Sequence, residues 1–147
     1  KEKITGVTDE HYHFELNLIR NEHVQIILVE DEFDEELTQL NEAWMKTVYQ
    51  KETCLFRAKT TPVILGLEGV IGCFYCKEQV GGVLLQVVPA NTKELSSQLV
   101  FLDYKNLDIM LIDETGPFFL YNDNRNTQLI KGFNKKENIN LEITSSE

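Results

Sequence analysis

Residues 62–88 read PVILGLEGVIGCFYCKEQVGGVLLQVV, and this stretch decides the fold class. It contains three short apolar runs, Val63–Leu67, Cys73–Cys76 and Val83–Val88. Their Val, Ile, Leu, Phe and Tyr content is typical of β-strands. The segments between the runs contain Gly, which supplies the positive φ angles that tight turns need. The stretch therefore predicts three short strands joined by turns.

The same pattern extends in both directions along the chain. In the N-terminal third, His13–Leu18 alternates apolar and polar residues, Val24–Val29 is a second apolar run, and the polar residues 20–23 between them predict a hairpin turn. Strands at this spacing, without intervening helices, predict an all-β sandwich or barrel-like fold. The runs on the C-terminal side are Leu99–Tyr104, Ile109–Ile112, Phe118–Tyr121, Gln128–Lys131 and Ile139–Ile143.

A weak internal repeat suggests how the strands are organised. Residues 73–78 align with residues 118–123, and residues 62–69 align at the same offset with residues 107–114. Three units of this length account for the whole chain. This predicts one domain, 1–147, with the β-trefoil arrangement of about twelve strands in three pseudo-repeats, six of which close a barrel.

Two segments have helical features. Leu37, Leu40, Trp44 and Val48 recur at three and four residues, as on a helix face, and acidic residues 34–36 suit a helix N-terminus. Residues 44–50 are also compatible with a strand, so helix and strand both stay open for residues 34–51. A short helical turn is expected at residues 91–96, with Asn91 as its cap.

The composition favours a protein partner. The chain has 147 residues, 42% of them hydrophobic, which fits one compact domain. Its net charge of -10 disfavours binding to nucleic acid or to an anionic membrane, because phosphates require clustered Lys and Arg. We expect a basic or mixed protein partner. No apolar run approaches the roughly 20 residues that span a bilayer, so we expect no membrane insertion.

The cysteines and the sequons suit a chain that bypasses the oxidising secretory route. The three cysteines, Cys54, Cys73 and Cys76, are an odd number and form no disulfide framework. No Asn-X-Ser/Thr sequon occurs among eleven asparagines. The chain begins Lys-Glu-Lys, without Met or an apolar signal segment, as a processed chain does.

Catalytic and metal-binding motifs are not evident. Cys73 and Cys76 form a CxxC pattern, but within a strand their side chains point to opposite faces, and no second CxxC completes a zinc site. We interpret both as structural cysteines. His11 and His13 share one strand face, and His23 is a conceivable third ligand, but surface histidines are the simpler interpretation. Since no P-loop, nucleophile elbow or zincin helix is present, we expect no enzyme, no cofactor and no metal.

The acidic run at residues 30–36 has six carboxylates in seven residues. It lacks the alternating ligands and the Gly of a calcium loop. A solvated loop is the simplest interpretation, and a docking patch for a basic partner, with Phe33 embedded in it, is the alternative.

The central seventy residues resemble the interleukin-1 family of cytokines. The resemblance lies in Pro62–Gly69, Cys73–Cys76 and Val83–Val87, which match the family's central hairpin, and extends to about residue 131. It continues through Asn91–Leu95, Leu99–Leu102, Ile109–Glu114, Gly116–Leu120 and Thr127–Lys131. The family usually has Glu-Ser and Pro-Gly-Trp-Phe where this chain has Asp113-Glu114 and Gly-Pro-Phe-Phe at residues 116–119, so the chain resembles a divergent member.

The resemblance implies a β-trefoil cytokine that acts in immune and inflammatory signalling. Such a protein is secreted without a classical signal peptide, with a precursor that can be cytoplasmic or nuclear, and it is a monomer when free. It binds an immunoglobulin-domain receptor of the interleukin-1 receptor class and recruits a co-receptor or blocks its recruitment. By position, the loops 51–61 and 134–138 are candidate contacts. The predicted receptor-binding residues are Asp31, Glu32, Asp34, Glu35, Lys135 and Lys136.

Three other functions fit an all-β chain. A heparin-binding growth factor needs a basic patch, which the net charge disfavours. A trefoil protease inhibitor needs a rigid reactive loop, usually with disulfides. A β-barrel carrier of an apolar ligand would show an enclosed cavity.

Overall fold

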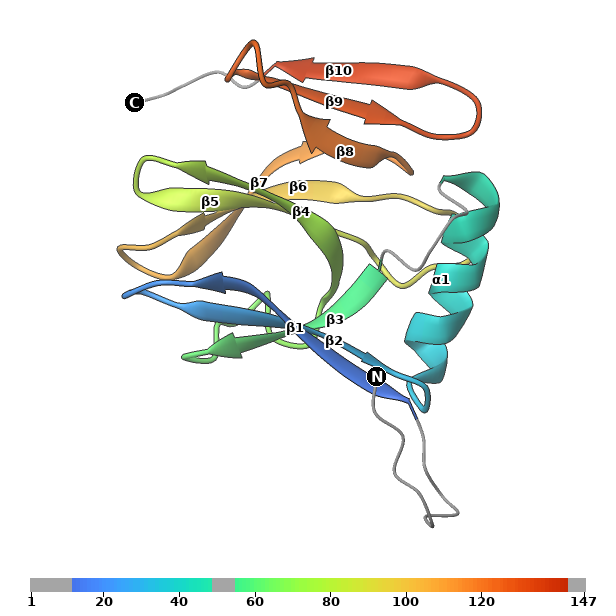
Figure 1. Cartoon of the computed structure of the whole chain (residues 1–147), viewed down its shortest axis with the longest axis horizontal. Helices are drawn as coiled ribbons and strands as arrows, with labels where there is room; N and C mark the ends of the chain where they lie inside the picture. Colours follow the sequence, from blue (N-terminus) through green and yellow to red (C-terminus); the bar gives the residue numbers. More distant parts are fainter. Residues whose placement is uncertain (1–11, 49–54, 143–147) are drawn as a thin grey trace.

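The computed structural model describes residues 12–48 and 55–142 as a mostly antiparallel β protein with one helix (Figure 1). The helix is α1 (Glu35–Thr47). The strands are β1 (His13–Arg20), β2 (Gln25–Asp31), β3 (Leu55–Thr61), β4 (Ile71–Gln79), β5 (Gly82–Val87), β6 (Gln98–Asp103), β7 (Asp108–Glu114), β8 (Phe119–Asn122), β9 (Leu129–Phe133) and β10 (Asn138–Glu142).

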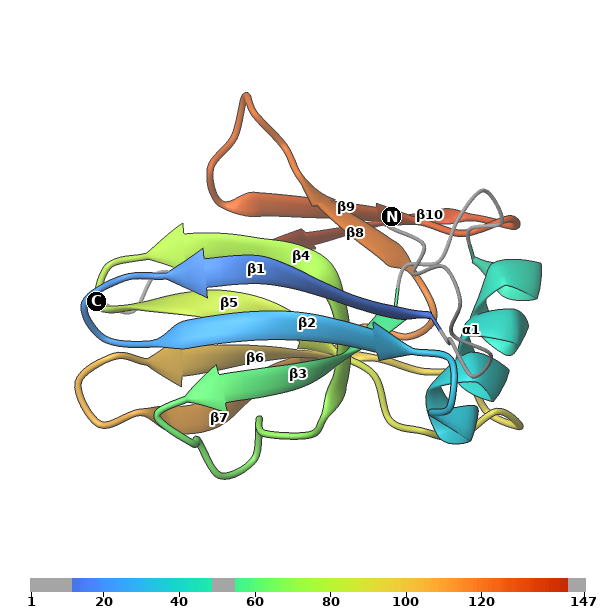
Figure 2. The ribbon, with the colours of Figure 1, turned by 60° about the horizontal axis from the view of Figure 1, so that its bottom comes forward.

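The strands form two sheets. In the larger sheet, β1 to β7 lie in sequence order, and each strand pairs antiparallel with the next. The smaller sheet has the order β10-β9-β8. Figure 2 shows that α1 occupies one end of the larger sheet, while the hairpin turn of β1 and β2 lies at the other end. The short loops of this meander follow from the turn residues that the sequence places between its apolar runs.

The all-β prediction is confirmed, but a closed barrel is not observed. Residues 12–48 and 55–142 contain ten strands in two open sheets, not the predicted twelve or so. Within these residues β7 pairs with β6 alone. Its Met110, Leu111 and Ile112 are exposed, which makes β7 an apolar edge strand of the larger sheet.

Most of the predicted apolar runs overlap strands, and Val63–Leu67 is the exception. That run forms turns, in which the amides of Leu67 and Glu68 both donate to the carbonyl of Ile64 and Gly66 has a φ of 89°. Residues 62–69 therefore differ in conformation from the aligned residues 107–114, which include β7. The prediction of a loop over residues 51–61 is wrong from residue 55 onward, where β3 begins. Residues 51–54, including Cys54, lie outside the described residues.

Helix α1 resolves the ambiguity in favour of a helix over residues 35–47, while residues 49–51 lie outside the described residues. Leu37, Leu40 and Trp44 are buried, and they pack in one cluster with Leu55 and Ile71. Burial of a one-sided apolar stripe is what stabilises a helix of this length.

The helical turn predicted at residues 91–96 is wrong. Asn91 does make the hydrogen bonds expected of a cap, because its Oδ1 accepts from the amides of Lys93 and Glu94. The chain nevertheless bends without forming a helix before β6 starts at Gln98. An Asn side chain that bonds to nearby amides replaces the helical hydrogen bonds instead of starting a helix.

A buried polar network joins the two sheets. Gln86 on β5 is 1% exposed. Its Oε1 accepts from the Cys73 thiol at 3.0 Å, and its Nε2 donates to Ser97 Oγ at 3.0 Å and to the carbonyl of Phe118 at 2.9 Å. Both amide hydrogens of Gln86 are thereby satisfied. Since Phe118 immediately precedes β8, this side chain ties the larger sheet to the start of the smaller one.

Replacing Gln86 with Ala should lower the free energy of unfolding by about 2–4 kcal/mol, because it opens a cavity and leaves buried polar groups without partners. Chemical denaturation measures the loss. The matched control is Gln39→Ala on the exposed face of α1, which should change stability by less than about 0.5 kcal/mol. Equal effects of the two substitutions would contradict the role of the network.

Candidate functional site

The six predicted receptor-binding residues lie at the two ends of α1. The acidic four lie at its N-terminal end, from Asp31 at the end of β2 to Glu35 at the start of α1. Lys135 and Lys136 lie in the turn between β9 and β10, and the amide of Lys135 donates to the carbonyl of Thr47 at the C-terminal end of α1. Figures 1 and 2 both show these two turns beside opposite ends of the helix. We call residues 31–36, the exposed face of α1 and residues 134–138 the α1 edge.

Asp34 has a structural role at the start of α1. Its Oδ1 accepts from the amide of Leu37 at 3.1 Å, which caps the helix. Arg57 on β3 donates from Nε to Oδ2 at 3.0 Å and from Nη2 to Oδ1 at 2.8 Å. Chiefly because of the hydrogen bond from Arg57, the pKa of Asp34 lies below its ordinary value. The Asp34 carboxylate therefore makes hydrogen bonds that stabilise the fold. The sequence pattern did not indicate this structural role.

Asp31 and Glu32 fix the turn that joins β2 to α1. Asp31 Oδ1 accepts from the amide of Phe33 at 2.9 Å, and its carbonyl accepts from the amide of Asp34 at 3.0 Å. Glu32 is tied to Tyr12 twice, since its amide donates to the Tyr12 carbonyl at 3.0 Å and its Oε1 accepts from the Tyr12 amide at 2.9 Å. These bonds preorganise the turn.

Phe33 is the exposed tip of this turn. Its side chain is 68% exposed, and every neighbour from residue 30 to residue 36 is a carboxylate residue. An exposed aromatic side chain on a fixed turn is the kind of residue that anchors a protein interface. The run of carboxylates in the sequence indicated that this segment is a candidate docking patch. Only the structure shows that the Phe33 side chain is exposed.

Glu35 is exposed on the first turn of α1. Beside it, a shallow hollow separates the helix from the segment after β5, and its lining residues are Glu35, Glu36, Gln39, Leu40, Ala90 and Thr92. Glu35 is therefore open to solvent at the edge of this hollow.

The turn at residues 134–138 is equally well fixed. Asn134 Oδ1 accepts from the amides of Lys136 at 2.7 Å and Glu137 at 3.0 Å, and its Nδ2 donates to the carbonyl of Pro117 at 3.0 Å. Lys135 and Lys136 are exposed on this turn. With 13 residues, α1 separates the two charged ends by about 20 Å. The predicted residues thus form two separate patches of opposite charge on one edge.

The CxxC cysteines lie in different parts of the core. Cys73 is buried in the cluster that packs against α1, and Cys76 is half-buried against the cluster that includes Val83. Burial is the main cause that raises the pKa of the Cys76 thiol, so the reactive thiolate is disfavoured. This placement supports the structural interpretation of both cysteines.

The two described histidines, His13 and His23, do not assemble into a metal site. His13 lies between Asp31 and Glu15, and His23 stacks on Tyr104 at a centroid distance of 4.8 Å. His11 lies outside the described residues. Within the described ranges there is no group of three or more His, Cys, Asp or Glu that could hold a metal ion.

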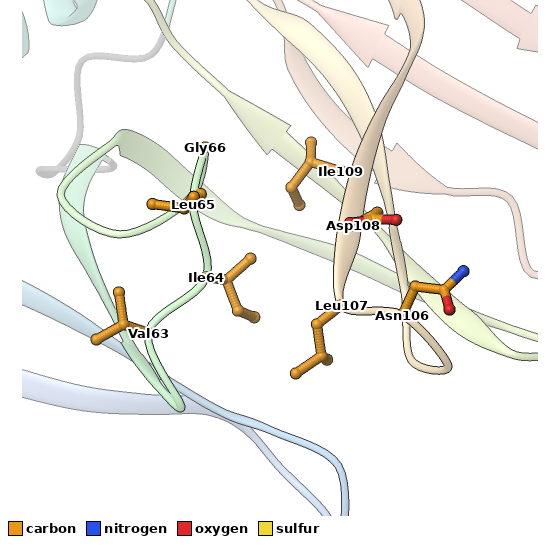
Figure 3. Close-up of a pocket in the computed structure, with 8 residues that line it drawn as sticks. All are labelled: Val63, Ile64, Leu65, Gly66, Asn106, Leu107, Asp108 and Ile109. Atoms are coloured by element: carbon orange, nitrogen blue, oxygen red, sulfur yellow. The ribbon is translucent and has the colours of Figure 1, made fainter.

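A second, apolar surface lies beside β7. Val63 and Leu65 are exposed, and a hollow of about 750 Å³ separates their loop from the turn between β6 and β7. Figure 3 shows Ile64 facing Leu107 and Ile109 across this hollow. The hollow is open to solvent, whereas a carrier of an apolar ligand needs an enclosed cavity.

No protein family model, curated protein or solved structure matches the chain. In the part of the chain that the structure describes, no helix has the length and apolar character needed to cross a membrane. The function is therefore inferred from the residues and their geometry.

Replacing Asp34 with Ala should lower the free energy of unfolding by about 1–3 kcal/mol near neutral pH, since it removes both the helix cap and one of the partners of Arg57. Because the pKa of Asp34 is lowered in the folded state, its contribution is present above the ordinary Asp pKa and is lost as the pH falls through the lowered value. The stability difference from the parent protein should therefore shrink in acid.

Glu35→Ala is the control for this substitution, because Glu35 is an exposed neighbour on the same turn. Urea denaturation at several pH values checks both variants. A stability loss for Asp34→Ala that matches the control, or that persists unchanged in strong acid, would contradict the role assigned to Asp34.

Proposed function

We propose that this chain is a divergent interleukin-1-type cytokine that binds an immunoglobulin-domain receptor through the α1 edge. The observation that carries the proposal is the preorganised turn that presents Phe33 among carboxylates, about 20 Å from a fixed basic turn. The family resemblance of residues 62–131 supplies the receptor class.

We also propose that the fold is a divergent β-trefoil. One contact supports this: Tyr75 Oη on β4 donates to Asn122 Oδ1 on β8 at 2.6 Å. Strand β4 contains the aligned segment 73–78 of the internal repeat, and β8 lies within the aligned segment 118–123. Repeat-related strands from the two sheets thus lie against each other, as the units of a repeated β fold do.

The proposed mechanism is recognition by preformed surfaces. Phe33 inserts into an apolar pocket of the receptor, and the surrounding carboxylates complement a basic rim. Because both turns are fixed by internal hydrogen bonds, binding orders few additional groups and loses little free energy to ordering. Lys135 and Lys136 contact a second, acidic surface on the same receptor or on a co-receptor, whose recruitment is promoted or blocked.

The proposal also includes the setting of this activity. The cytokine acts outside the cell in immune and inflammatory signalling and leaves the cell without a classical signal peptide. The odd number of cysteines, the half-buried Cys76 and the lack of sequons in the sequence support this route.

A binding screen against ectodomains of the interleukin-1 receptor class tests the proposed function. We expect the folded chain to bind at least one member, and Phe33→Ala to weaken that binding about 10- to 100-fold, the loss typical of a central anchor residue. A correctly folded sample that binds no ectodomain would overturn the proposal.

Charge reversal tests the acidic side of the α1 edge. The double variant Glu32→Lys, Glu35→Lys should slow association and weaken binding, because it turns an attractive rim into a repulsive one. The control is Glu22→Lys, whose side chain is 84% exposed in the turn at the far end of β1 and β2. Unchanged affinity in the double variant, measured by surface plasmon resonance, would refute the assigned contacts.

A further inference from the structure

We propose that His13 is a pH-dependent clamp on the turn that carries Phe33, a form of regulation that rests on the receptor-binding function proposed above. The clamp closes when the imidazole is protonated and opens when it loses the proton. The pH of the surroundings would then determine how tightly the turn holds Phe33.

The geometry of His13 requires the charged ring. Its Nδ1 lies 2.7 Å from Asp31 Oδ2, and its Nε2 lies 3.0 Å from Glu15 Oε2. Both partners are carboxylates, which only accept hydrogen bonds at neutral pH. A neutral imidazole has one N–H and one lone pair, so it could donate to only one of them. Only the imidazolium donates to both.

The charges around the ring favour the same state. The hydrogen bond to Glu15, followed by that to Asp31, raises the pKa of His13, and the bond from His13 is the main cause that lowers the pKa of Glu15. These groups come from β1 and β2, and Lys59 on β3 acts on Glu15 as well. The ring is only half-buried, so water remains close to it.

Asp31 connects the ring to the turn. His13 and Asp31 lie directly opposite each other where β1 pairs with β2. While one oxygen of Asp31 faces the ring, the other accepts from the amide of Phe33. The carbonyl of Asp31 accepts from the amide of Asp34, the cap of α1. A change at His13 therefore reaches both the anchor residue and the start of the helix through one side chain.

The sign of the pH effect follows from the raised pKa. A group whose pKa is raised on folding stabilises the fold fully below its unfolded value and loses that contribution as the pH rises through its folded value. The clamp is therefore closed in mildly acidic conditions. It opens as the pH rises past a midpoint above 6.5, the ordinary value for His. Opening leaves the carboxylates of Glu15 and Asp31 without the positive charge between them.

NMR spectroscopy of the full chain without any receptor tests the clamp. Between about pH 5 and about pH 9, where ordinary carboxylates no longer titrate, the ring signals of His13 and the backbone amide signal of Phe33 should shift with one common midpoint above 6.5. In His13→Gln the shift of the Phe33 amide at that midpoint should disappear. In Asp31→Asn, which keeps an oxygen for the Phe33 amide, the midpoint of His13 should fall.

His23→Gln is the matched control, because its side chain is 42% exposed, against 43% for His13, and it lies near Glu22 at the other end of the hairpin. This control should leave the Phe33 profile unchanged. The clamp is overturned if His13 titrates at or below 6.5, or if the Phe33 profile survives in His13→Gln.

A receptor that binds the chain extends the test to regulation. Affinity of the parent protein should fall between about pH 6 and about pH 8, and His13→Gln should lose most of that dependence. Equal pH dependence in both proteins would overturn the regulatory role while leaving the proposed function in place. Because the NMR test needs no receptor, failure of the receptor screen does not affect its outcome.

Discussion

The ion pair between Asp34 and Arg57 is the interaction on which the α1 edge of this molecule depends. Arg57 also donates to Glu36 and to the carbonyl of Gly69. One guanidinium thereby connects the start of α1, the strand β3 and the turn before β4. Its planar arrangement of donors suits this task better than a Lys ammonium would. Without this pair the residue that caps α1 would lose its link to β3, and the turn carrying Phe33 would lose this support on the sheet.

The sequence predicted the strands well because their signal is local. Apolar runs bounded by turn residues overlap the strands of both sheets, and the pattern of Leu37, Leu40 and Trp44 anticipated the buried face of α1. Val63–Leu67 has the same composition as the strands, yet it forms turns. Composition alone could not separate the two outcomes, because a run of this kind becomes a strand only where a neighbouring strand is available to pair with it.

The candidate site was predicted less completely, for a related reason. The sequence identified the acidic run and the two lysines by their charge. It could not show which carboxylates are used internally, because that depends on Arg57 and His13, which are distant in sequence. Nor could it show that Phe33 is exposed, since aromatic residues in short chains are usually counted as core. Asp34 has a structural role because it pairs with Arg57, which is distant in the sequence. Its neighbour Glu35 is exposed to solvent, and the local sequence pattern does not distinguish the two residues.

The apolar edge of β7 has a consequence for how the protein behaves in concentrated solution. Two copies pairing antiparallel about Leu111 would bring Asp108 of one chain opposite Glu114 of the other, twice in each pair. Like charges in that position oppose strand pairing, so these carboxylates act as gatekeepers against edge-to-edge aggregation. The protection is electrostatic and is therefore weakened by salt and by acid. The acidic ends of β7 thus oppose pairing between the edge strands of two copies.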